Sequence, residues 1–157
     1  MHSRLKVLII MILATFALGV YLNAEPTPNQ LNLSDFSQFE IDMIKKEAIE
    51  NKLPSKYLSI VFAIRKAESG SKGREFGILH PKCLKLCREN PNDTFEIQAG
   101  WCCATVAKNV IRWQKAGKKQ PFITFLGNRY CPPTEHELNK NWIPNVNKWV
   151  NKIQQSR

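Results

Sequence analysis

The stretch LPSKYLSIVFAIRKAESG, residues 53–70, decides the fold of this chain. Its apolar side chains recur with helical spacing and fall within about 100° of one another on a helical wheel. The members of this stripe are Tyr57, Ile60, Val61 and Ile64. Ser55 is the predicted N-terminal cap, and Gly70 is the predicted C-terminal end. The stretch therefore predicts a buried helix.

Glu68 lies on the apolar side of this predicted helix, only about 20° from Tyr57. Burial and the negative end of the helix dipole both disfavour an ionised carboxylate and should raise its pKa. A carboxyl group that stays protonated near neutral pH suits a general acid. Glu68 is therefore a candidate catalytic acid. The alternative is a structural glutamate that turns to solvent or pairs with Arg65, Lys72 or Arg74.

Length and the first residues indicate a single exported domain. The chain has 157 residues, which suits one domain. Residues 1–24 begin with basic side chains, continue as an uncharged run over residues 7–22, and end in Ala24, which is the layout of a signal peptide. A retained membrane anchor is the second interpretation. Residues 25–34 predict a polar linker, and residues 35–157 the folded domain.

The charge balance favours an anionic partner. The chain carries 23 Lys and Arg against 13 Asp and Glu, a net charge of +10. Without residues 1–24, which hold two basic residues and no acidic one, 21 basic and 13 acidic residues leave a net charge of +8. This surplus suits an anionic cell-wall polymer or membrane surface. Export and the lack of a nucleic-acid motif argue against nucleic acid as the partner.

Five cysteines predict a disulfide-stabilised domain. Cys83, Cys87, Cys102, Cys103 and Cys131 all belong to the exported part, where an oxidising compartment favours two disulfides and one remaining thiol. The sequence does not choose among the possible pairings. The spacing of Cys83 and Cys87 would permit zinc, but no histidine completes a usual ligand pattern. We therefore expect neither a metal nor a cofactor.

Helical periodicity extends to most of the remaining domain, and no stretch alternates as a strand would, so the expected fold class is mainly α. Residues 71–92 lack periodicity and predict a long connection, which often carries function. The four tryptophans are predicted core residues, among them Trp142. The other predicted helices are one ending near Leu53, one from a capping box at Asp93 and Glu96 to Gly117, one over residues 121–127, and one beginning near Pro144.

Residues 53–70, together with the FGIL segment at residues 76–79, resemble the soluble lytic transglycosylase and goose-type lysozyme family. In that family a catalytic glutamate ends a core helix and is followed by serine, as Glu68 is followed by Ser69. A Gly-Leu-Met-Gln type segment then lines the sugar groove. This chain has Gly77, Ile78 and Leu79 there, with His80 in place of the glutamine.

The segment FLGNRYCPPTEHELNKNWIPNV, residues 125–146, is similar to the part of those domains that brings a tyrosine back against the acid. Tyr130 would take that role. The resemblance covers residues 53–153 and implies a lysozyme-like single domain, with a long loop after the catalytic helix. Ser69, Phe76, Gly77, Ile78 and Tyr130 are the predicted substrate-binding residues, Phe76 because its neighbours form a loop rather than a helical stripe.

The resemblance implies cleavage of the β-1,4 bond between N-acetylmuramic acid and N-acetylglucosamine in peptidoglycan glycan strands. Glu68 would protonate the leaving oxygen and then accept a proton from the 6-hydroxyl of the muramic residue, which gives a 1,6-anhydro product. Two alternatives stay open. A hydrolytic lysozyme of the same fold requires a second carboxylate, for which Glu75 and Asp93 are candidates. A catalytically silent cell-wall-binding module would not need Glu68 at all.

Overall fold

The computed structural model describes residues 31–132, 134 and 136–155. This part of the chain contains helices and no strand, so the mainly α class is confirmed. The predicted signal peptide, residues 1–24, lies outside the described residues. Among the described helices, none combines the length and apolar character that a membrane-spanning segment needs. The helices are α2 (Gln38–Glu50), α3 (Leu58–Glu68), α4 (Pro81–Glu89), α5 (Thr94–Lys115), α6 (Phe122–Tyr130) and α7 (Trp142–Gln154), with the short 3₁₀ helices η1 (Ser55–Tyr57) and η2 (Glu137–Asn141).

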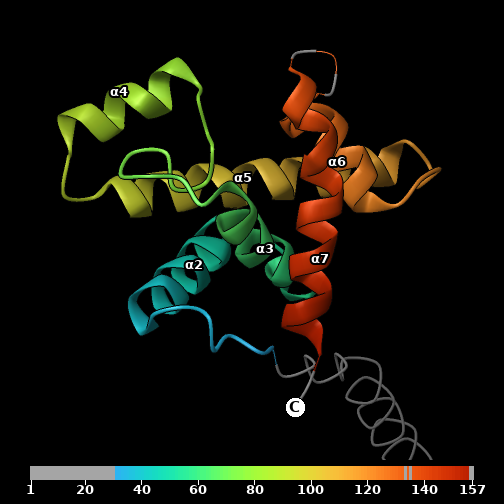
Figure 1. The fold of residues 1–157 in the computed structure, drawn as a ribbon, viewed down its shortest axis with the longest axis horizontal. Helices are drawn as coiled ribbons and strands as arrows, with labels where there is room; N and C mark the ends of the chain where they lie inside the picture. Colours follow the sequence, from blue (N-terminus) through green and yellow to red (C-terminus); the bar gives the residue numbers. More distant parts are fainter. Residues whose placement is uncertain (1–30, 133, 135, 156–157) are drawn as a thin grey trace, which may run out of the picture.

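Helix α3 lies at the centre of the domain, as Figure 1 shows. It packs most extensively against α7 and also contacts α2 and α5. Every residue from Ser59 to Ile64 is buried, including both faces of the helix. A helix that is apolar nearly all round has to be enclosed by other elements, and α3 satisfies this by packing against three of them.

Both ends of α3 differ from the predicted boundaries. Ser55 does not cap the helix; it begins the 3₁₀ turn η1, and no side chain caps that turn. At the other end the left-handed residue is Ser69, with φ 45°, one position before the predicted Gly70. Gly70 is required for another reason. A Cβ atom there would lie 1.8 Å from the backbone oxygen of Arg74, because the following loop folds back on the helix end.

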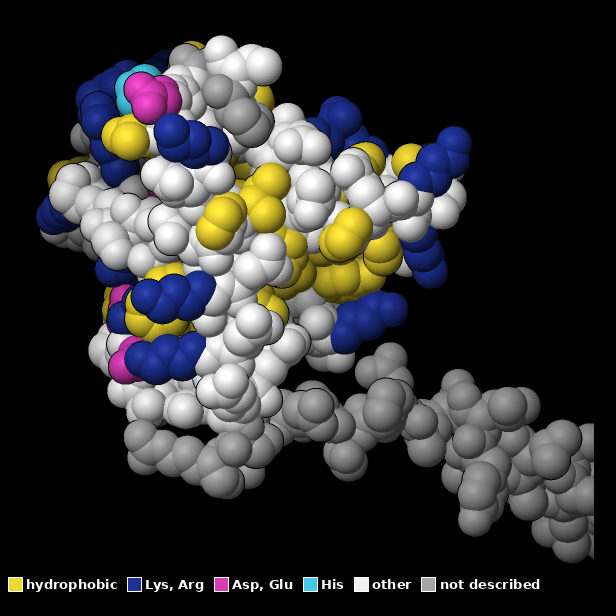
Figure 2. All heavy atoms as spheres, turned by 45° about the vertical axis from the view of Figure 1, so that its right-hand side comes forward, with side chains coloured by type: hydrophobic (Ala, Val, Ile, Leu, Met, Phe, Trp, Pro, Cys, Tyr) yellow, Lys and Arg dark blue, Asp and Glu magenta, His cyan; other side chains and the backbone are white. Residues whose placement is uncertain are grey.

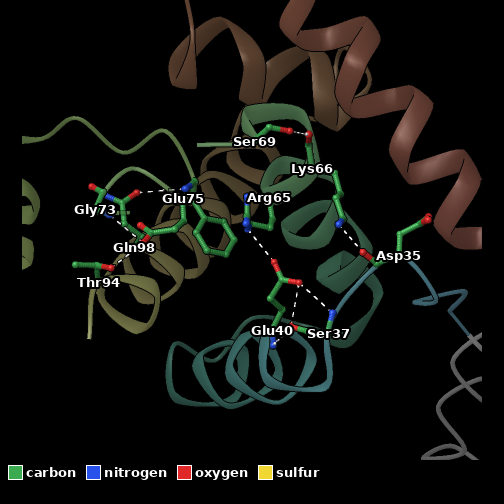
Figure 3. A network of polar contacts seen from close by, with 11 residues as sticks. Asp35, Ser37, Glu40, Arg65, Lys66, Ser69, Gly73, Glu75, Thr94 and Gln98 are labelled. Carbon is green, nitrogen blue, oxygen red and sulfur yellow. Dashed lines mark hydrogen bonds and ion pairs between the residues drawn. The ribbon is translucent and has the colours of Figure 1, made fainter. Parts of the chain in front are cut away.

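Helix α2 begins at a capping box formed by Ser37 and Glu40. The same Glu40 carboxylate accepts a hydrogen bond from Arg65 Nε at 3.1 Å, which ties α2 to α3 (Figure 3). The helix ends at Glu50 rather than near Leu53. The capping box predicted at the start of α5 does not form, because Asp93 makes no capping hydrogen bond.

The prediction of an unstructured connection over residues 71–92 is wrong for its second half, which forms α4. Pro81 occupies the first turn, where its missing N–H costs nothing. Cys83 and Cys87, four residues apart, are the buried positions of this helix, and α4 packs against α5. The inward residues are cysteines rather than aliphatic residues, whereas Leu86 is exposed, and this obscures the apolar periodicity.

The cysteines do not form the predicted disulfides. No disulfide at bonding distance occurs in the part of the chain that the structure describes, so disulfide stabilisation is not supported. Cys83, Cys102 and Cys103 are instead fully buried, where a thiol packs as a small apolar side chain. Burial raises the pKa of Cys103 to about 12, so this thiol stays neutral.

The excess of Lys and Arg over Asp and Glu is visible on the protein surface. Figure 2, which brings the α6 side of the molecule forward, shows Lys and Arg side chains spread over this face, with few Asp and Glu side chains among them. A partner that approaches this face therefore meets positive charge.

Candidate active site

Glu68 is the last residue of α3, and its side chain is half-buried. Its Oε1 accepts a hydrogen bond from Trp142 Nε1 at 2.7 Å. Trp142 is the first residue of α7 and is only 6% exposed. Within the described residues Glu68 forms no ion pair, and Arg65 pairs with Glu40 instead. The structural alternative, in which Glu68 pairs with a neighbouring cation, is not what the structure contains.

Gly77 brings the loop after α3 directly against the carboxyl group. A Cβ atom at this position would lie 2.3 Å from Glu68 Oε2, and the backbone has φ +68°. Both features require glycine. The N–H of Gly77 donates to the backbone oxygen of Arg74 at 2.9 Å, which fixes the turn. Because residue 77 has no side chain, none of its atoms beyond the backbone occupies the space beside Glu68 Oε2.

The environment of Glu68 favours its protonated form. Burial raises the pKa of Glu68, and the hydrogen bond from Trp142 only partly offsets this effect. No carboxylate of the described residues contributes to the shift. An indole N–H can only donate, so Oε1 has to act as the acceptor. When Glu68 is protonated, the hydrogen bond to Oε1 favours the proton on Oε2, the oxygen beside Gly77.

Tyr130 supports the site indirectly. Its ring stacks on Trp142, with centroids 5.2 Å apart and planes inclined by 29°. Its hydroxyl donates to the Phe76 backbone oxygen at 2.6 Å. This hydroxyl therefore binds the loop after α3 and not Glu68. Burial raises the pKa of Tyr130 well above its ordinary value, so the phenol remains a neutral donor. Tyr130 therefore packs against Trp142, whose indole N–H binds Glu68 Oε1.

Close packing of α6 and α7 also positions Trp142. A Cβ atom at Gly127 would lie 2.5 Å from Ile143 Cγ1 and 3.0 Å from Trp142 Cε3. The glycine in the middle of α6 thus lets the start of α7 approach closely. This approach carries the indole to the end of α3.

Comparisons with protein-family models, with curated proteins and with solved structures found no match. Within the described residues, no group of three or more His, Cys, Asp or Glu side chains is arranged to hold a metal ion. His80 caps α4 and stacks on Trp101, with ring centroids 5.0 Å apart.

Two of the predicted groove residues belong to the core. The Phe76 side chain is fully buried and packs on Phe95 with ring centroids 5.3 Å apart, so the prediction that its ring lines a sugar groove is wrong. Ile78 is also buried. Ser69, in contrast, is exposed beside the acid, and its hydroxyl donates to the Lys66 backbone oxygen at 2.7 Å. The structure thus brings Ser69 and Gly77 next to Glu68.

The loop after α3 is held by two buried polar side chains (Figure 3). Gln98 Nε2 donates to the backbone oxygens of Gly73 and Ile78 at 2.9 and 3.0 Å, and Gln98 Oε1 accepts from Ile78 N at 3.2 Å. Glu75 Oε1 accepts from Gly73 N at 2.9 Å and from Thr94 Oγ1 at 2.7 Å. Glu75 is therefore a buried loop anchor, not a second carboxylate that faces a substrate. The sequence signal for Gln98 is a polar residue among the apolar positions of its helix.

Trp142 is a residue of the candidate site that the sequence does not reveal. The sequence predicts it, like the other tryptophans, as a core residue, and its burial confirms that part of the prediction. The available signal is chemical, because a buried indole N–H normally finds an acceptor. The sequence alone does not indicate that this acceptor is Glu68, 74 residues earlier.

Proposed function

We propose that this protein is an exported lytic transglycosylase that cleaves peptidoglycan, with Glu68 as general acid and then general base. The observation that carries the proposal is the carboxyl group at the end of the core helix. Burial raises the pKa of Glu68, Trp142 Nε1 donates to one carboxyl oxygen, and Gly77 has no side chain to displace the other. The resemblance of residues 53–70 and 76–79 to transglycosylases supports the same assignment.

The reaction uses one carboxyl group twice. Glu68 Oε2 gives its proton to the glycosidic oxygen, and the bond from that oxygen to C1 of the muramic residue breaks. The resulting carboxylate then takes the proton of the 6-hydroxyl of the same residue, whose oxygen forms the new bond to C1. The acid is regenerated and no water is consumed. The balance of atoms gives a 1,6-anhydro sugar and a free 4-hydroxyl.

A single-carboxyl mechanism fits the surroundings of Glu68. A hydrolase with two carboxylates places them about 5 to 9.5 Å apart. The positions of the two candidates for a second carboxylate favour the single-carboxyl mechanism, since Glu75 is buried in the loop anchor and Asp93 is an exposed residue at the start of α5. An internal nucleophile, the 6-hydroxyl, removes the need for a second carboxylate.

A digest of purified peptidoglycan tests the proposal. Lytic transglycosylase activity releases muropeptides lighter than the hydrolysed ones by one water, about 18 Da, which mass spectrometry resolves. Fully hydrated products would assign the protein to the lysozymes instead. A folded protein that releases nothing would support the cell-wall-binding module.

Replacing Trp142 with phenylalanine is expected to shift the pH dependence of turnover. Trp142→Phe keeps an aromatic ring against Tyr130 but removes the N–H that lowers the pKa of Glu68, so this pKa should rise further. Turnover by a general acid falls as pH rises above the pKa of that acid, so the descending limb should move to higher pH. Turnover at the optimum should fall about tenfold, the equivalent of one charge-assisted hydrogen bond. A pH series of kcat measures both effects.

Trp113→Phe is the matched control for this variant. It also removes an indole hydrogen bond, from Trp113 Nε1 to the Gln120 backbone oxygen at 2.7 Å, but at the far end of α5. Its pH profile should follow that of the wild type. An unshifted profile for Trp142→Phe, or an equal shift in both variants, would contradict the role of Trp142.

The raised pKa of Glu68 also predicts how stability depends on pH. Between the ordinary value of about 4.5 and the raised value, the folded state keeps a proton that the unfolded state has lost, so the free energy of unfolding falls as pH rises. Glu68→Gln lacks this titration. Its free energy of unfolding, minus that of the wild type, should therefore increase from about pH 4 towards neutrality. Urea unfolding at several pH values checks the sign, and a decreasing difference would mean that the pKa is lowered.

A further inference from the structure

A basic cavity lies next to the loop that follows the candidate acid. It has a volume of about 350 Å³ and lies between the loop after α3, the helix α4 and the first residue of α5. The volume suits a small group rather than a whole sugar chain. Its basic lining residues are Lys72, Arg74 and Arg88, and its apolar ones are Leu84, Cys87 and Pro91.

The positive charge of the basic cavity is not neutralised. Throughout the described part of the chain, Lys72, Arg74 and Arg88 form no ion pair with an acidic side chain. Two acidic side chains lie nearby, the buried Glu75 and the exposed Asp93 before Thr94, and Glu75 Oε1 is already engaged by Gly73 N–H and the Thr94 hydroxyl. A surplus of positive charge therefore remains around the cavity. Like charges that surround one cavity repel one another, and a bound anion relieves this repulsion.

The start of α5 adds to the positive potential in the basic cavity. Thr94, the first residue of this 22-residue helix, lines the cavity. The N-terminus of a helix carries partial positive charge on its free N–H groups. Asp93 occupies the cap position but makes no side-chain capping bond. Three cations and a helix N-terminus thus meet at one cavity.

Backbone contacts connect the basic cavity to the candidate acid. Arg74 accepts the backbone hydrogen bond of Gly77, and Gly77 lies against Glu68 Oε2. The backbone of Arg74 also packs tightly on Gly70, two residues after the acid. The Gln98 and Glu75 hydrogen bonds hold this loop on α5. An anion bound in the cavity would therefore have a fixed place relative to Glu68.

The structure assigns the basic cavity as a subsite for a carboxylate on the peptide branches of the glycan strand, an inference that rests on the proposed function. Peptide branches grow from the muramic residue, which is the sugar that Glu68 would attack, so their carboxylates travel with the scissile bond. Arginine forms paired hydrogen bonds with a planar carboxylate, and Arg74 and Arg88 supply two such groups. The apolar wall formed by Leu84 and Pro91 suits the aliphatic part of such a branch.

The test compares binding to two forms of insoluble peptidoglycan, one intact and one stripped of peptides by an amidase. All proteins carry Glu68→Gln, so that bound strands are not cleaved. The cavity variant adds Lys72→Gln, Arg74→Gln and Arg88→Gln. The control variant adds Lys45→Gln, Lys115→Gln and Lys119→Gln, which remove the same charge from exposed positions away from the cavity. Arg88→Gln alone, at an exposed position of α4, serves if the triple variant does not fold.

The cavity variant should bind intact peptidoglycan about tenfold more weakly than its parent, as expected for three exposed ion pairs. It should bind stripped strands as well as its parent does, and the control variant should lose little on either. Equal weakening on both forms, an equal loss in the control, or no binding to either form would overturn the subsite. Binding that depends instead on phosphate-bearing wall polymers would also overturn it. Cleavage by the wild type is scored separately, so a failed subsite and a failed enzyme assignment give different results.

Discussion

Glu68→Gln should abolish release of anhydro-muropeptides while leaving the fold intact. Glutamine is nearly isosteric, and its amide oxygen can still accept the hydrogen bond from Trp142. What it loses is the transferable proton at the Oε2 position. General acid and base catalysis by one side chain raises the reaction rate by about 10²- to 10⁴-fold. Turnover of the variant should therefore fall by a factor of about 10² or more. Initial rates on peptidoglycan, with circular dichroism and thermal melting, measure the two expectations together.

Glu47→Gln is the matched control for this substitution. Glu47 is also buried, at 7% exposure, and burial likewise raises the pKa of Glu47. It lies on α2, and its carboxylate approaches Gly100 of α5 rather than the end of α3. Turnover of Glu47→Gln should match that of the wild type. If Glu68→Gln keeps full turnover, or if both variants lose it equally, Glu68 is not the catalytic acid.

Gly77→Ala should reduce turnover by far more than backbone strain alone would. The added Cβ atom would lie 2.3 Å from Glu68 Oε2, so the acid or the loop has to move. Misplacing a catalytic group by about 1 Å costs about 10²-fold in rate. The left-handed backbone, with φ +68°, adds about 1–2 kcal/mol of destabilisation for a non-glycine residue. Turnover and urea unfolding separate the two effects.

Gly117→Ala isolates the backbone contribution. Gly117 has a similar φ of +74°, but within the described residues no atom lies within 4 Å of the position that its Cβ would take. This variant should lose stability to about the same degree and keep its turnover. If the two glycine variants lose turnover equally, the close approach of Gly77 to the acid has no functional role.

The sequence predicts the fold best where packing follows a simple period. The stripe around Ile60 and Ile64 locates α3 and places Glu68 at its end, because a long apolar stripe with helical spacing is typical of a buried helix. Helix α4 escapes prediction because cysteines fill its inward positions. Helix caps are harder to predict, because a side chain with the right spacing for a capping box can bind another residue instead. Ser37 and Glu40 form a capping box, whereas Glu96 is drawn instead into an ion pair with Lys46 on another helix.

The sequence predicts two members of the candidate site, Glu68 and Gly77. It does not predict the contacts that the other members make. Tyr130 lies near Glu68, but its hydroxyl donates to the Phe76 carbonyl, a pairing that depends on how α6 meets the loop. Phe76 has the sequence pattern of a loop residue, yet Gln98 anchors the loop so that this ring turns into the core. The role of Trp142 depends on where α7 packs. Such contacts join distant parts of the chain, so local patterns do not specify them.

The hydrogen bond between Trp142 and Glu68 joins residues 74 positions apart, so the environment of the acid depends on the packing of the C-terminal helix on α3. Without α7 packed on α3, Glu68 would lack the hydrogen bond from Trp142 Nε1. A chain still being synthesised, or one that lacks residues 142–155, would carry the glutamate without its environment. The activity proposed here would therefore depend on a segment that is distant from the acid in the sequence.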